Sequence, residues 1–273
     1  MDASVGPFGL LKTRRFAPLL IAQTLGAFND NLFKQALIIS LAYGGVALTG
    51  VPTETLVLAS AALYVAPFFL FSAIAGQVAD KFERSALVRR IKTVEIGVMA
   101  FAALGFLIGS APMLLASIFL AGAQSAFFQP VKNALLPDYL SRAELAVGNG
   151  VMSGATFLSI LIGTVAGAVL IRHPLGGLIF CLLALTAALC GRASAGAAPQ
   201  TAAGAPGARI RWNALTESAR LIAHALSLRG LARPFVGTLW VWLMGAAIIA
   251  VMPIYARDVL GGDPTVAAMM MAV

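Results

Sequence analysis

Charged side chains are scarce in this chain, because only 11% of its 273 residues are Asp, Glu, Lys or Arg. A soluble domain of ordinary composition carries about 25%. Hydrophobic residues occupy 60% of the positions, and a chain with so few polar side chains cannot cover its surface in water. The scarcity of charge therefore excludes a soluble globular protein and predicts an integral membrane protein.

Residues that commonly carry chemistry are also few. Neither His173 nor His224 has a Cys, His or acidic partner at metal-ligand spacing, and neither is followed five residues later by the Asp of a glycerolipid acyltransferase motif. Cys181 and Cys190 would lie roughly 13 Å apart along one helix, too far for a disulfide. The chain also lacks a glycine-rich phosphate-binding loop. We expect no enzyme, no cofactor, no metal and no ATP-driven activity.

Long apolar runs are what the chain has instead. A membrane-spanning helix needs about 20 mostly apolar residues. Seven runs qualify, and an eighth begins near Pro264: the seven are 16–43, 54–79, 90–109, 112–129, 148–171, 176–191 and 234–256. The first run follows a basic segment but is too long for a cleavable signal peptide, so we expect it to be a spanning helix.

The basic residues between these runs indicate how the chain crosses the membrane. If the amino terminus lies inside, the inner segments hold 16 of the 19 Lys and Arg residues, the outer segments hold Arg172 and Arg257, and Lys34 falls within the first run. Cytoplasmic segments carry such an excess of basic residues. We therefore predict a multi-pass protein with a cytoplasmic amino terminus, and we attribute the net charge of +8 to this topology and not to nucleic-acid binding.

Composition divides the chain into three parts. Residues 1–190 hold the first six runs and are expected to form a six-helix bundle. Residues 191–232 begin with an Ala-, Gly- and Pro-rich stretch typical of a linker and continue at 211–229 with an amphipathic helix suited to the inner membrane surface. Residues 233–273 begin a second bundle. We therefore interpret the chain as a fragment that supplies the first half, the linker and the start of the second half.

Asp30 and Lys34 are ionisable residues near the middle of the first run. An ionisable residue at the centre of a bilayer costs about 2.5–3.5 kcal/mol on insertion scales. The two lie on one helical face, so one interpretation is a structural ion pair inside the bundle. The other is a cavity-lining carboxylate that contacts an ammonium headgroup or a coupling cation. Asn29, Asn31 and Gln35 add polar neighbours, which favours the second.

A motif follows the second run, where residues 76–84 read GQVADKFER. A glycine, an acid four residues later and then basic residues, at this place in the topology, resemble the signature of the major facilitator superfamily. The resemblance implies an all-α membrane fold of two six-helix halves. It also implies a conformational gate formed by Gly76, Asp80, Lys81 and Arg84, in which the acid helps to lock the halves together on the inner side. The alternative is a helix N-cap with solvated basic neighbours.

Three further stretches narrow the resemblance: residues 22–31 (AQTLGAFNDN), 130–132 (PVK) and 149–167. They are similar to bacterial lysophospholipid transporters, superfamily members that flip lysophospholipids across the inner membrane for re-acylation. The resemblance implies alternating access, an inner-membrane location and a phosphate contact for Lys132; an inner-surface lysine that follows the charge rule explains Lys132 equally well. The expected partners are the lipid bilayer, the lysophospholipid and a fused or separate acyltransferase.

Two other functions remain open. An exporter of drugs or siderophores in the same superfamily would bind small amphiphilic drugs in competition with lysolipids. A membrane module of a fused acyltransferase would be followed by soluble catalytic domains after a twelfth helix. Two local patterns are expected to serve structure alone: Gly163 and Gly167 allow close helix packing, and Lys92 and Glu95 form a pair within one helix.

Overall fold

The computed structural model of the chain describes residues 6–43, 45–201, 204–205, 207, 209–228, 230, 232–241 and 244–245. The chain divides into two compact units, Met1–Ala214 and Leu215–Val273. Within the described part, every regular element is a helix. The all-α class expected from the sequence is therefore confirmed.

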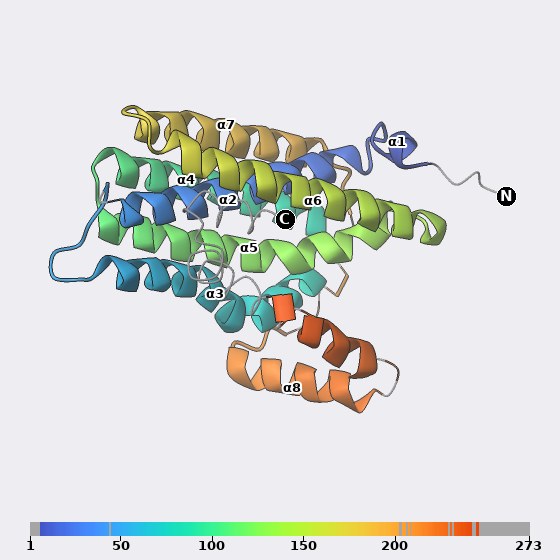
Figure 1. The fold of residues 1–273 in the computed structure, drawn as a ribbon. Coiled ribbons are helices and arrows are strands. Elements are labelled where there is room, and N and C mark those ends of the chain that lie inside the picture. The colour runs from blue at the N-terminus through green and yellow to red at the C-terminus, as the bar shows by residue number, and fades with distance from the viewer. Residues whose placement is uncertain are drawn as a thin grey trace. The chain divides into compact units, whose positions relative to one another are not determined.

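Among the described residues of the first unit, six long helices follow the short helix α1 (Pro7–Leu10) (Figure 1). They are α2 (Ala17–Ala42), α3 (Thr53–Lys81), α4 (Arg84–Leu107), α5 (Ala111–Tyr139), α6 (Arg142–Leu170) and α7 (Gly176–Ala197). Each corresponds to one of the first six apolar runs, although the boundaries differ. Helix α2 packs against α3, α6 and α7, while α5 packs against α3 and α4. The polar first run therefore lies inside the bundle.

Several helices extend beyond the apolar runs that predicted them. Helix α4 begins at Arg84 instead of residue 90, α5 continues to Tyr139 instead of 129, and α6 begins at Arg142 instead of 148. All three extensions lie at the end of the bundle that carries most of the basic residues. Hydropathy identifies only the residues of a helix that suit hydrocarbon. The backbone hydrogen bonds of the helix continue into the more polar residues that flank them.

Helix α7 also differs from the expected boundary. The sequence composition predicts a linker from residue 191, but the helix continues to Ala197. Alanine has the highest helix propensity, and residues 191–197 contain no proline. Ala198 is extended, as expected for a residue that precedes a proline, here Pro199. The linker composition therefore begins inside a helix.

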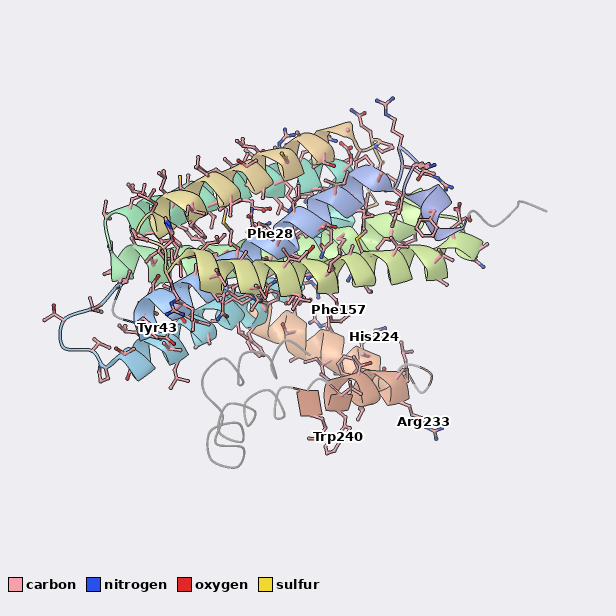
Figure 2. The ribbon with its side chains drawn as sticks, turned by 45° about the horizontal axis from the view of Figure 1, so that its top comes forward. Phe28, Tyr43, Phe157, His224, Arg233 and Trp240 are labelled. Carbon is pink, nitrogen blue, oxygen red and sulfur yellow. The ribbon has the colours of Figure 1, made fainter. Side chains whose placement is uncertain are left out.

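The surface of the first unit suits contact with lipid. Among the described residues, four helices are long and apolar enough to cross a membrane: Thr55–Lys81, Ala111–Tyr139, Arg142–Leu170 and Gly176–Ala197. Helices α2 and α4 carry more polar residues. Large apolar side chains remain on the outside, such as Phe69, which is 73% exposed, and Phe157, which is 69% exposed. Phe157 is labelled in Figure 2. Such an apolar exterior is the property of a membrane protein.

Ion pairs gather at one end of the bundle. Arg15 before α2 pairs with Glu144 in the first turn of α6 at 2.5 Å. Arg84 at the start of α4 pairs with Asp138 at the end of α5 at 2.8 Å. These contacts bring together the helix ends that the charge pattern assigns to one side of the membrane.

The second unit contains most of α8 (Ala214–Ser227) and further helical residues at 232–241. Helix α8 lies within the range 211–229 predicted for an amphipathic helix. The seventh run is described only as far as residue 245, and the eighth run lies outside the described residues. Most of the predicted start of a second bundle at 233–273 also lies outside the described residues.

Glycines bring two pairs of helices into backbone contact. A Cβ atom on Gly163 or Gly167 of α6 would overlap the carbonyl oxygen of Phe28 or Leu32 of α2, respectively. A Cβ atom on Gly122 of α5 would overlap a backbone carbonyl of α3. The prediction that the spacing of Gly163 and Gly167 serves close packing is therefore confirmed.

We expect Gly163→Val to destabilise the bundle by about 1–3 kcal/mol, the range for overpacking a well-packed interior. The matched control is Gly154→Val on the same helix, because a Cβ atom at Gly154 has no heavy atom within 4 Å. The measurement is the apparent melting temperature of each detergent-solubilised variant. Equal melting temperatures for the two variants would contradict the close contact between α2 and α6.

Candidate functional site

A cavity of about 160 Å³ lies within the first unit and is lined by residues of α2, α3, α4, α5 and α6. Much of its lining is polar. The polar residues are Gln23, Asp30, Asn31, Lys34, Tyr64, Lys92, Gln124, Ser125, Gln129 and Thr156. Polar and ionisable residues inside a membrane bundle face cavities and mark the paths of substrates or ions. This cavity is the candidate functional site.

Asp30 is held in the cavity by hydroxyl groups from two other helices. Tyr64 of α3 donates a hydrogen bond to Asp30 Oδ2 at 3.1 Å, and Ser125 of α5 donates to the same oxygen at 2.6 Å. The other oxygen, Oδ1, accepts no hydrogen bond from the described residues. The carboxylate is therefore fixed in place while one oxygen remains available for a ligand.

Lys34 does not form the ion pair that its spacing from Asp30 permits. Among the described residues no ion pair joins the two side chains. The Lys34 Nζ atom lies 4.5 Å from the centroid of the Tyr64 ring, and the hydroxyl of the same Tyr64 binds the carboxylate. Tyr64 thus contacts both charges, and both line the cavity. Asp30 and Lys34 therefore do not form the direct structural ion pair that was one interpretation of the sequence.

Asn29 and Asn31 lie on different sides of α2. Asn31 lines the cavity, and its amide donates to the Ala27 carbonyl at 2.7 Å. Asn29 is fully buried and faces α4 and α7, where its amide donates to Glu95 Oε1 at 3.1 Å and to the Ala184 carbonyl at 3.2 Å. Successive residues of a helix point about 100° apart, so three consecutive polar residues cannot all face one cavity.

Lys132 of α5 is 8% exposed and is absent from the residues that line the cavity. Of the residues that the sequence suggested for substrate or ion binding, the structure brings together Asp30, Asn31 and Lys34. It places Asn29 behind the cavity wall and Lys132 elsewhere on α5.

A second charged pair lies at the cavity and was expected only to serve structure. Lys92 Nζ is 2.6 Å from Glu95 Oε2, and the two side chains are 1% and 2% exposed, so the predicted helix pair is confirmed. Lys92 also lines the cavity. Glu95 accepts further hydrogen bonds from Asn29 at 3.1 Å and from Gln124 at 3.4 Å.

Sequence reasoning also missed Tyr64, Gln124 and Ser125. Tyr64 is a single polar residue within an apolar run, Gln124 and Ser125 are an adjacent polar pair within another, and these interruptions are the only signal that the sequence offers. Whether such a residue faces the cavity or a neighbouring helix depends on the packing of α3 and α5 against α2.

The residues predicted to form a gate lie at the junction of α3 and α4. Arg84 pairs with Asp138 of α5 at 2.8 Å and approaches Asp80 at 3.9 Å. Asp80 lies in the last turn of α3 and its side chain is 71% exposed. It is therefore not the N-cap of α4, a position that Glu83 occupies. Gly76 and Lys81 also belong to the end of α3.

Glu83 supplies a further negative charge to this junction. The hydroxyl of Ser85 donates a hydrogen bond to the Glu83 carboxylate, and this bond holds the pKa of Glu83 below its ordinary value. Arg89 lies 3.7 Å from the same carboxylate. Glu83 is therefore ionised at neutral pH.

The segment after α7 crosses the same end of the bundle. The Tyr139 hydroxyl donates to the Pro199 carbonyl at 2.6 Å, and the Ala205 amide donates to the Asp80 carbonyl at 2.8 Å. The Arg211 amide donates to the side-chain oxygen of Gln77 at 2.7 Å. The linker is thus attached to the ends of α3 and α5.

Comparison with known proteins supports the resemblance seen in the motifs. The chain matches the family model of the Major Facilitator Superfamily over residues 16–273. It is 29% identical over 263 residues to proteins named lysophospholipid transporter LplT from Salmonella gallinarum and Salmonella typhi. Each alignment covers 96% of this chain and 62% of the relative, so the chain spans less than two thirds of the length of these relatives. The chain belongs to the major facilitator superfamily.

Proposed function

We propose that the chain is the first part of a transporter that moves lysophospholipids across a bacterial inner membrane. The observation that carries this proposal is a polar cavity, centred on the fixed carboxylate of Asp30, inside a bundle with an apolar exterior. The names of the relatives agree with such a cargo, whose headgroup is polar and whose tail is apolar.

Asp30 would bind the ammonium group of the cargo. Its Oδ2 atom is held by Tyr64 and Ser125, so its Oδ1 atom can accept a charge-assisted hydrogen bond without reorganisation of the site. The same carboxylate would bind a coupling cation if transport is driven by one. Asn31 and Lys34 supply further polar contacts to the headgroup.

The part of the cavity that the first unit forms is smaller than a site that encloses a whole drug molecule. Sites that enclose drug-sized ligands typically have volumes of roughly 300–1,000 Å³, whereas this cavity has about 160 Å³. A lysophospholipid can place its headgroup in the cavity and leave its acyl chain among the apolar helices.

Transport would proceed by alternating access, with two six-helix halves that rock about a site near the midplane. Residues 1–190 supply one half, residues 191–232 the cytoplasmic linker, and residues 233–273 the first helices of the other. The end of the bundle that carries Arg15 and Arg84 would face the cytoplasm, in accordance with the distribution of basic residues. Asp80 and its neighbours would close this end. An acyltransferase, fused or separate, would use the delivered lysolipid.

We expect Asp30→Asn to abolish uptake of labelled lysophosphatidylethanolamine by spheroplasts that express the full-length protein, because the neutral amide cannot balance an ammonium group. Expression and membrane insertion should be unchanged. Glu217→Gln serves as the control, since it removes a carboxylate of α8 that is absent from the residues that line the cavity. Undiminished uptake by Asp30→Asn would remove Asp30 from the site, and uptake that does not depend on the gene would refute the lysolipid cargo.

We expect Asp80→Asn to slow uptake while the equilibrium binding of lysophosphatidylethanolamine to the purified protein stays the same. Asp80 is exposed and lies outside the cavity, so its loss should affect the exchange between states. Removal of a coupling of about 1 kcal/mol corresponds to roughly 5-fold, which is the expected decrease in rate. A loss of binding would contradict the role of Asp80 in a gate.

A further inference from the structure

The ammonium group of Lys92 occupies a defined place in the cavity wall. Its Nζ atom lies 4.8 Å from the centroid of the Phe128 ring, and both residues line the cavity. A Cβ atom on Gly26 would overlap the same Nζ atom. The absence of a side chain at Gly26 is therefore what allows the ammonium group to lie against α2.

The ammonium group of Lys92 and the carboxylate of Asp30 therefore lie beside successive turns of the same face of α2. Gly26, which contacts Lys92, precedes Asp30 by four residues, or about 6 Å along the axis of α2. Both Gly26 and Asp30 line the cavity. A zwitterionic headgroup that carries a phosphate and an ammonium group can therefore contact Lys92 and Asp30 at the same time.

We propose that Lys92 binds the phosphate of the lysophospholipid headgroup while Asp30 binds its ammonium group. This inference rests on the function proposed above and assigns the phosphate contact to a residue other than Lys132. A lysine ammonium has three N–H donors, so Lys92 can donate to a phosphate without losing its contact with Glu95.

Glu95 weakens this phosphate contact and so permits release. Its carboxylate neutralises the charge of Lys92 at 2.6 Å and repels a phosphate placed nearby. Glu95 itself stays satisfied when Lys92 also contacts the ligand, because Asn29 and Gln124 donate hydrogen bonds to it as well. A transporter must also release its cargo, so a phosphate contact of limited strength suits this site.

Lys34 is the other lysine that lines the cavity and is the natural comparison. It lies one turn beyond Asp30 on the opposite side from Gly26, and its Nζ atom faces the Tyr64 ring. If Lys34 bound the phosphate, the headgroup would lie in the reverse direction along α2. Assignment of the phosphate to Lys92 and assignment to Lys34 therefore predict opposite orientations of the headgroup.

The test measures the affinity of the full-length protein in detergent for two ligands with the same acyl chain. Lysophosphatidylethanolamine carries a phosphate and an ammonium group, and an N-acylethylenediamine carries the ammonium group alone. The variants are Glu95→Gln, the double variant Lys92→Gln with Glu95→Gln, and Lys34→Gln. The double variant retains a neutral side-chain hydrogen bond, so no charge is left buried without a partner.

We expect the double variant to bind lysophosphatidylethanolamine roughly 10-fold more weakly, which is the loss expected for a hydrogen bond to a charged group. Its affinity for the N-acylethylenediamine should not change. Glu95→Gln alone should strengthen the binding of lysophosphatidylethanolamine, because Lys92 is no longer neutralised. A purely structural pair would not produce this gain.

Three results would overturn the assignment while leaving the lysolipid function intact: unchanged binding by the double variant, equal weakening for both ligands, or a phosphate-specific loss in Lys34→Gln instead. Weaker binding of lysophosphatidylethanolamine by Glu95→Gln would also contradict it, and Lys34→Gln provides a test if the variants of the buried Lys92–Glu95 pair do not fold. A wild-type protein that binds no lysophosphatidylethanolamine would instead refute the proposed function.

Discussion

The burial of charge inside an apolar bundle is the constraint on which this site depends. Four ionisable side chains line or support the cavity, two carboxylates and two lysines, and each carboxylate is held by hydrogen-bond donors from more than one helix. Asp30 relies on Tyr64 and Ser125, and Glu95 relies on Lys92, Asn29 and Gln124. Removal of any of these donors would leave a buried polar group with fewer partners, which is costly in an apolar interior, so the charges also fix the positions of the helices.

The helices themselves were predictable from the sequence because spanning segments need long apolar stretches, and the first six runs each correspond to a helix. Their polar ends were not predictable by the same criterion. Helix α5 continues through Pro130 and Pro137 to Tyr139, although proline within a helix removes a backbone hydrogen bond. Hydropathy cannot report such extensions, since their residues are more polar than those of the apolar run.

The candidate site was predictable only in part. Asp30 and Lys34 attract attention because ionisable residues within an apolar run are costly, and both line the cavity. The opposite directions of Asn29 and Asn31 follow from helical geometry, but the side that faces the cavity depends on how α2 packs. Lys92 was interpreted as a local partner of Glu95, and its contact with Gly26 requires the three-dimensional arrangement of α2 and α4.

The glycine contacts divide the bundle into two tightly joined helix pairs, α2 with α6 and α3 with α5. Backbone pressed against backbone leaves no side chain that can rearrange, so sliding within either pair meets an immediate steric barrier. Asp30 belongs to the first pair, while Tyr64 and Ser125 belong to the second. Under the proposed function, a cargo bound to this carboxylate would act between two stiff helix pairs and would bias how one pair sits against the other.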